Sequence, residues 1–152
     1  MDKIKLGVIG AGLIWDLTHK YKLEKLKDIF EIKAFSVRSE ISHNKLRKEF
    51  PTSEIFDNYQ DLIKLDYIDA IVILTPINMN AKITIDALNT KKNVIVEKPL
   101  ATNRIDVEKI IDLAPQNIKE HVRENRYGKN TRCFERERDE GNAAAYARVF
   151  SV

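Results

Sequence analysis

One short stretch near the N-terminus constrains the fold of this chain most strongly. Residues 6–9, Leu-Gly-Val-Ile, form an apolar run too short for a buried helix, and they predict a strand. Gly10 and Gly12 follow at once, and Leu13 and Ile14 then begin an apolar pattern at helical spacing. A strand, a tight glycine turn and a helix N-terminus together direct free N–H groups and a positive dipole end at one point. The stretch therefore predicts an anion site, which in a dinucleotide-binding fold holds a pyrophosphate.

The glycine pattern departs from the usual fingerprint at its third position. The fingerprint Gly-x-Gly-x-x-Gly places a small residue where this chain has Trp15, and a small residue there lets the helix pack closely on the sheet. We expect Trp15 to swing outward, or the helix to stand slightly further from the sheet. Two glycines after a strand also occur in ordinary strand-to-helix turns, so this alternative stays open on these residues alone.

Composition fits a single globular domain. The chain has 152 residues, of which 43% are hydrophobic and 32% charged. A net charge of +3 is too small to indicate a nucleic-acid or membrane-surface partner, and we expect neither. The single cysteine, Cys133, excludes an internal disulfide, and no apolar run approaches the roughly 20 residues of a membrane span. The N-terminus lacks the layout of a signal peptide, so we expect a cytoplasmic protein.

Beyond the glycine turn, strand-like and helix-like segments alternate. Short, mostly apolar segments predict strands at residues 31–37, 54–56, 69–74 and 93–96. Helical spacing predicts helices over residues 13–27, 42–50, 59–65, 78–90 and 103–113, with Ser42 and either Asn103 or Thr102 as N-caps. Strict alternation favours an α/β fold, a doubly wound parallel sheet of the Rossmann type. In such sheets ligands bind beyond the carboxyl ends of the strands, and the loops at those ends contain Gly12, Arg38, Thr75, Pro76, Glu97 and Lys98.

Two of these segments, together with the glycine turn, resemble the Gfo/Idh/MocA (glucose–fructose oxidoreductase / inositol dehydrogenase) family. They are residues 69–76, Asp-Ala-Ile-Val-Ile-Leu-Thr-Pro, and residues 93–101, whose Glu-Lys-Pro element is far more specific than the glycine turn. The resemblance covers residues 4 to about 127. It implies a dinucleotide-binding domain over residues 1–127, followed by a second domain built on a large open sheet. It also implies hydride transfer between NAD(P) and a hydroxyl-bearing carbon, often on a sugar or polyol-like substrate.

The resemblance also implies roles for individual residues. At the pyrophosphate it places Gly10, Gly12, Leu13 and Ile14, and on the nicotinamide side Thr75 and Pro76. Glu97 would approach the nicotinamide ribose, and Asn80 stands where the family often has a histidine near the cofactor. Asn125 and Arg126, at the end of a sixth strand, would also face the cofactor. Lys98 would be the catalytic lysine, whose ammonium can hydrogen-bond the substrate oxygen and stabilise charge there. Pro99 would set a sharp, cis turn that aims Lys98 into the cleft. The alternative is that Lys98 is an ordinary surface lysine.

The end of the second predicted strand bears on the choice of cofactor. NAD enzymes usually place an acidic residue there to hold the ribose hydroxyls, whereas residues 36–39 are Ser-Val-Arg-Ser. Arg38 and Ser39 could instead hold a 2′-phosphate by charge-assisted hydrogen bonds. We therefore favour NADP over NAD, and the alternative is that Arg38 is a solvated loop residue.

The last part of the chain is harder to interpret. Residues 128–141 predict a polar helix and residues 143–152 a strand, which resembles the first strand of the family's second domain. The chain thus reads as a truncated member, which we expect to bind a dinucleotide weakly and to turn over little substrate. His19, His43 and His121 match no family position, and we expect them at the surface; Cys133 is expected to be inert.

Two other hypotheses remain open on the sequence. The chain could be a non-catalytic, stand-alone nucleotide-binding module or a surface for a partner. It could also form a homodimer in which residues 143–152 pair with those of a second copy, because an apolar strand without a sheet is an exposed edge.

Overall fold

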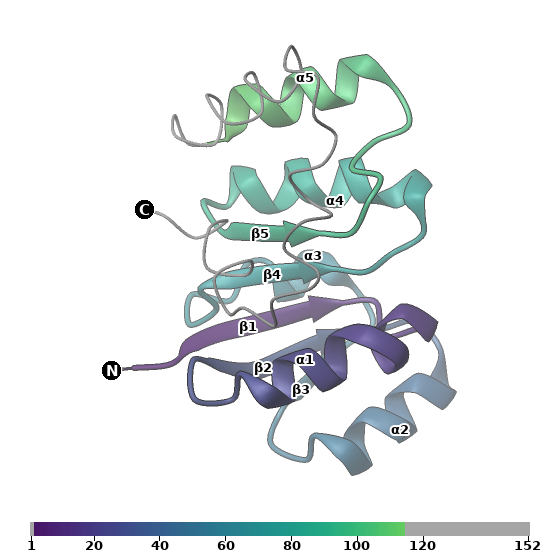
Figure 1. The fold of residues 1–152 in the computed structure, drawn as a ribbon, viewed down its shortest axis with the longest axis vertical. Helices are drawn as coiled ribbons and strands as arrows, with labels where there is room; N and C mark the ends of the chain where they lie inside the picture. Colours follow the sequence, from purple (N-terminus) through teal and green to yellow (C-terminus); the bar gives the residue numbers. More distant parts are fainter. Residues whose placement is uncertain (1, 115–152) are drawn as a thin grey trace.

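The structure, a computed structural model, describes residues 2–114. In this part of the chain, parallel strands form one sheet in the order β3-β2-β1-β4-β5, and the arrowheads of β1, β4 and β5 point to the same side in Figure 1. The strands are β1 (Ile4–Ile9), β2 (Phe30–Ser36), β3 (Glu54–Phe56), β4 (Ala70–Ile73) and β5 (Asn93–Val96). The predicted parallel α/β fold is confirmed. The strand order reverses between β1 and β4, and ligands of such sheets bind at this switch point.

Helices cover both faces of the sheet (Figure 1). They are η1 (Trp15–His19), α1 (Lys20–Lys25), α2 (Glu40–Glu49), α3 (Tyr59–Leu62), α4 (Ile77–Asn89) and α5 (Arg104–Leu113). On one face, Leu23 of α1 and Leu46 of α2 pack on Val8 and Val72. On the other face, Leu62 of α3 and Ile83 of α4 pack on Ile71 and Ile73, and α5 lies against α4.

The predicted helix starts are correct in one case and wrong in another. Asn103 caps α5, because its side chain accepts a hydrogen bond from the N–H of Asp106. The N-cap of α2 is Ser39 rather than Ser42: the Ser39 hydroxyl accepts from the Ser42 N–H at 3.1 Å. Ser39 has an extended backbone, which lets its side-chain oxygen meet that N–H. This start brings the N-terminus of α2 up to the end of β2.

Trp15 turns inward, so the expected outward swing is wrong. Its side chain is fully buried, and its ring meets Phe35 edge-on at 5.3 Å and Phe50 at 5.9 Å between centroids. The helix accommodates this ring through a π-turn, in which the N–H of Lys20 bonds to the carbonyl of Trp15. Such a turn contains one residue more than an α-turn and is frequent at functional sites. Trp15 therefore anchors the helix to the sheet.

Two histidines expected at the surface are buried. His19 is 5% exposed and His43 is 8% exposed. Each has a polar partner, a carboxylate for His19 and a backbone carbonyl for His43, and these partners allow the rings to be buried. The partner of His19, Glu97, lies 78 positions away in the sequence, so local spacing could not reveal it.

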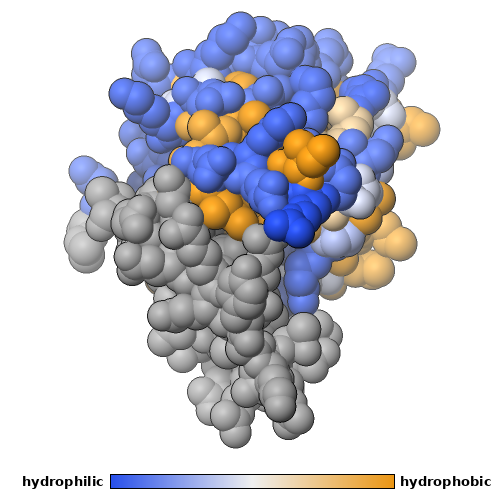
Figure 2. Space-filling model, turned by 90° about the horizontal axis from the view of Figure 1, so that it is seen from above, coloured by the Kyte–Doolittle hydropathy of each residue, from blue (hydrophilic) through white to orange (hydrophobic). Residues whose placement is uncertain are grey.

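The described surface is mainly hydrophilic on the face seen from the α5 side, with separate groups of hydrophobic residues (Figure 2). Within residues 2–114, no helix is both long enough and apolar enough to cross a membrane. The predicted sixth strand, the polar helix at 128–141, the strand at 143–152 and the dimer it would form lie outside the described residues. The same holds for Asn125, Arg126, His121 and Cys133.

The aromatic anchor gives a test of stability. Replacing Trp15 with alanine removes the largest fully buried side chain, and we expect the free energy of unfolding to fall by about 3–5 kcal/mol. Urea unfolding followed by circular dichroism measures this, since Trp15 is also the chain's only tryptophan. As a control, Leu17→Ala changes a side chain on the same turn that is 71% exposed, and its effect should stay within about 0.5 kcal/mol. Equal losses in both variants would contradict the anchoring role.

Candidate cofactor site at the carboxyl edge of the sheet

The two glycines of the turn have different surroundings. Gly10 has a φ of +87°, and a Cβ there would lie 2.7 Å from the carbonyl oxygen of Leu74. Only glycine fits this left-handed, closely packed position without strain. At Gly12 an added Cβ would meet no atom within 4 Å, so the turn opens onto free space. Leu13 and Ile14, the first residues after the turn, are 74% and 41% exposed. Their backbone N–H groups belong to a helix start, where such donors lack helical partners.

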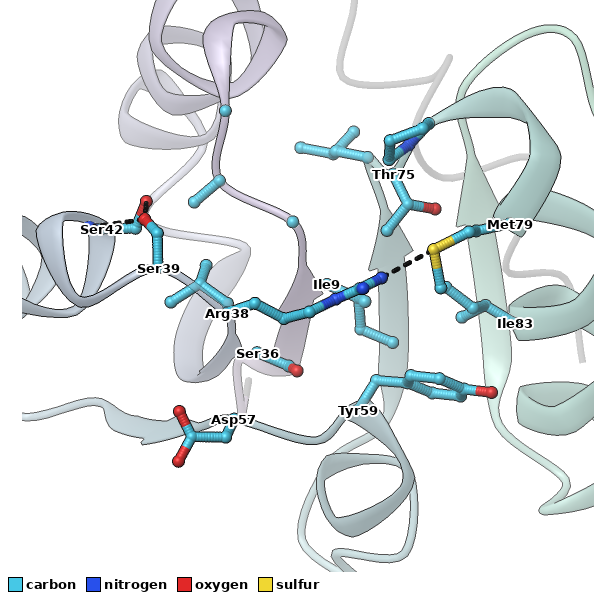
Figure 3. Close-up of a pocket in the computed structure, with 16 residues that line it drawn as sticks. Ile9, Ser36, Arg38, Ser39, Ser42, Asp57, Tyr59, Thr75, Met79 and Ile83 are labelled. Carbon is cyan, nitrogen blue, oxygen red and sulfur yellow. Dashed lines mark hydrogen bonds between the residues drawn. The ribbon is translucent and has the colours of Figure 1, made fainter.

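A cavity of about 300 Å³ lies beside this turn, at the switch point of the sheet (Figure 3). It brings together residues from the carboxyl ends of four strands. Of the predicted cofactor residues it is lined by Gly10, Gly12, Arg38, Ser39, Thr75 and Pro76. The cavity is also lined by four residues that were not predicted, Asp57, Tyr59, Met79 and Ile83. Asp57 and Tyr59 follow β3, a strand so short that its end was not expected at this edge of the sheet. Met79 and Ile83 have the sequence pattern of ordinary core residues of α4.

Arg38 extends across the cavity. Its Nη2 donates to the sulfur of Met79 at 2.8 Å, and Figure 3 shows the guanidinium lying between the ends of β2 and α4. The Ser39 hydroxyl donates to the hydroxyl of Ser42 at 2.8 Å, so both hydroxyls lie at the N-terminus of α2. The end of β2 therefore presents a cation and two hydroxyls close to a positive helix end, a combination that suits an anionic group.

A carboxylate, that of Asp57 just after β3, also lines the cavity. Its side chain is 88% exposed and lies 3.0 Å from Nε2 of His43. The same Nε2 lies 2.9 Å from the carbonyl oxygen of Val37. Because both neighbours are acceptors, Nε2 of His43 carries a proton shared between them. His43 thus fixes the backbone immediately before Arg38.

Tyr59 forms a fixed wall of the cavity. Its hydroxyl donates to Asp86 and accepts from Lys82, both at 2.7 Å. Burial raises the pKa of Tyr59 above its ordinary value, against the opposing effect of the Lys82 ammonium. The phenol is therefore neutral at neutral pH, and its hydroxyl is already engaged. The aromatic ring is the part of Tyr59 left to contact a ligand.

On the other side of the turn, Asn80 connects two loops. It is 2% exposed. Its Oδ1 accepts from the hydroxyl of Thr75 at 2.9 Å, and its Nδ2 donates to the carbonyl oxygens of Glu97 at 3.2 Å and Pro99 at 3.1 Å. The Lys98–Pro99 peptide bond is cis, as predicted. The amide of Asn80 is therefore engaged within the protein, and it holds the segment 97–99 beside Thr75.

Glu97 is held through both carboxylate oxygens. Oε1 accepts from Nε2 of His19 at 2.5 Å, and Oε2 accepts from the backbone N–H of Lys98 at 3.2 Å. Glu97 and Lys98 do not line the cavity; they are joined to it through Asn80 and Thr75. Among residues 2–114 there is no group of three or more potential metal ligands.

A parallel sheet with a glycine turn at its switch point, and a cavity lined from the adjoining strand ends, defines a dinucleotide-binding domain of the Rossmann class. Residues 4–123 match the family described as "Oxidoreductase family, NAD-binding Rossmann fold", and the chain belongs to this family, Gfo/Idh/MocA. The expected resemblance is thus confirmed.

Individual relatives agree with this assignment. An uncharacterized oxidoreductase of Schizosaccharomyces pombe is 30% identical over 128 residues, covering 83% of this chain and 35% of the relative. The scyllo-inositol 2-dehydrogenase (NADP(+)) of Bacillus subtilis is 25% identical, covering 66% and 27%. A crystal structure of a 3-ketoreductase from Actinomadura kijaniata in complex with NADP is similar with a TM-score of 0.67 and 28% identity, covering 74% and 34%. The chain spans about a third of the length of these relatives.

The two glycines give a paired test of the turn. We expect Gly10→Ala to lower the free energy of unfolding by about 1–3 kcal/mol, because it adds backbone strain and a close contact with Leu74. Gly12→Ala meets no atom within 4 Å and should leave the melting temperature unchanged or slightly raised. Thermal unfolding followed by circular dichroism compares them. A destabilisation of similar size in both would contradict the assigned geometry.

Proposed function

We propose that this chain supplies the cofactor-binding part of an NADP-dependent oxidoreductase, which transfers hydride to or from a hydroxyl-bearing carbon of a sugar or polyol-like substrate. The observation that carries the proposal is the single cavity shared by the glycine turn and Arg38. The turn suits a pyrophosphate, and the end of β2 suits a further phosphate.

The residues present fit a dinucleotide. Gly12 opens onto free space, so a phosphate can approach the backbone there. Met79 and Ile83 give the cavity an apolar side, and the ring of Tyr59 gives it an aromatic wall, as an adenine base requires. The cavity volume, about 300 Å³, is at the lower end of the range for ligand pockets and suits the adenosine half of the cofactor.

The preference for NADP rests on Arg38 and its surroundings. A planar guanidinium binds a phosphate through two parallel, charge-assisted hydrogen bonds, which are much stronger than a contact with a thioether. We therefore expect Arg38 to leave Met79 when a 2′-phosphate is present. Asp57 is paired with His43 and does not take the position of the acid that holds ribose hydroxyls in NAD enzymes. The names of the Bacillus and Actinomadura relatives also mention NADP, which supports this choice.

Lys98 is the proposed catalytic residue. The nicotinamide, when bound, supplies or accepts the hydride. The Lys98 ammonium would donate a hydrogen bond to the substrate oxygen and pass a proton to or from it as the charge on that oxygen changes. Support comes from the Asn80 bonds, which hold the segment 97–99 beside Thr75 at the edge of the cavity.

Cofactor binding tests the proposal directly. Isothermal titration of the chain should give tighter binding of NADPH than of NADH. Arg38→Ala should weaken NADPH binding by roughly 10- to 100-fold, the range of one or two lost charge-assisted bonds, and should change NADH binding by less than about threefold. The matched control is Arg47→Ala, the same change on an exposed part of α2 away from the cavity. Tighter binding of NADH by the unmodified chain would overturn the preference for NADP.

A further inference from the structure

We propose that His19 is a positioning residue for the Glu97-Lys98-Pro99 segment, and that it ties this segment to the helix that follows the glycine turn. The inference rests on the proposed function, because it assigns His19 a role in the nicotinamide half of that site. It makes the phosphate turn and the lysine-bearing loop parts of one connected unit.

The contact between His19 and Glu97 is direct and partly buried. Nε2 of His19 lies 2.5 Å from Oε1 of Glu97, and the His19 side chain is 6% exposed. Because the acceptor is a carboxylate, Nε2 is the donor. A hydrogen bond to a carboxylate is among the stronger side-chain interactions, and partial burial strengthens it further. The bond joins residues 78 positions apart, from η1 to the end of β5.

The π-turn explains why His19 faces inward. Trp15, His19 and Leu23 follow one another at intervals of four, and all three are buried. In a regular α-helix such a row drifts by about 40° per step around the axis. The wider turn between Trp15 and His19 offsets this drift, so all three side chains stay on the inner face. The ring of Trp15, packed on Phe35 and Phe50, holds this turn in place.

His19 and Asn80 control different parts of the same segment. Asn80 binds the main-chain oxygens of Glu97 and Pro99 and so fixes the path of the backbone. His19 binds the Glu97 side chain, whose second oxygen accepts the N–H of Lys98. His19 therefore sets the direction of the carboxylate proposed to meet the nicotinamide ribose. It acts through Glu97, and the cavity at the adenosine end does not include it.

Two ligands separate this role from a general effect on folding. NADPH engages both halves of the site, whereas 2′,5′-ADP engages only the adenosine half. We expect His19→Asn, whose amide is too short to reach Glu97, to weaken NADPH binding by about tenfold and 2′,5′-ADP binding by less than twofold. His19→Gln places an amide N–H near the position of Nε2, and it should restore NADPH binding to within about threefold of the unmodified chain. Circular dichroism melting shows that each variant is folded.

The other buried histidine provides the matched control. His43 fixes the backbone before Arg38, so His43→Asn should weaken both ligands by similar factors. A double-mutant cycle adds a second readout. In a Glu97→Ala background there is no carboxylate for residue 19 to bind, so His19→Asn and His19→Gln should bind NADPH equally. This comparison between two polar variants also stands if one of the single substitutions lowers stability.

The outcomes distinguish the two proposals. If the unmodified chain binds neither NADPH nor 2′,5′-ADP, the proposed function fails. If it binds both, and His19→Asn either matches the unmodified chain or weakens both ligands alike, the positioning role of His19 is overturned while the proposed function stands. Failure of His19→Gln to restore NADPH binding, or a difference between the two variants in the Glu97→Ala background, would likewise overturn it.

Discussion

The close approach of Gly10 to its neighbouring strands is the constraint on which the site depends. Its N–H donates to Ser36 at the end of β2, and its left-handed backbone fits against the carbonyl of Leu74 after β4. The N–H of Leu74 in turn donates to Ile9. Three strand ends are thereby joined by main-chain contacts that leave no room for a Cβ. Because these contacts hold the ends together, loops far apart in sequence share one cavity at the switch point.

Much of the fold could be predicted because parallel sheets leave strong local signals. The central strands β1 and β4 are largely buried and appear as short apolar runs, and the helices between the strands keep one apolar face. The expectations for Trp15 and His19 failed because they rested on the small residue usual at position 15 and on the lack of a family match for His19. Both side chains are instead buried on a helix that contains a π-turn. A π-turn is set by how one bulky ring packs against Phe35 and Phe50, and no local spacing reports that packing.

The candidate site was predictable to a similar extent and for a related reason. Residues that directly follow strands are brought to one edge by topology alone, so Arg38, Ser39, Thr75 and Pro76 could be placed together in advance. Met79 and Ile83 could not, because an apolar residue that faces a cavity has the same sequence pattern as one that faces the core. The linking role of Asn80 was equally hidden, since it depends on two backbone carbonyls from a loop far along the chain.

The departures from the family pattern bear on whether the chain retains an enzyme's site. A tryptophan at the third glycine position would argue for a non-catalytic module if it blocked the turn, but Trp15 points into the core and leaves the space at Gly12 open. Asn80, in place of the frequent histidine, still offers one acceptor and two donors, which is what Thr75 and the segment 97–99 require. Trp15 and Asn80 are thus both buried and do not line the cavity, so each of these departures changes a residue that positions others.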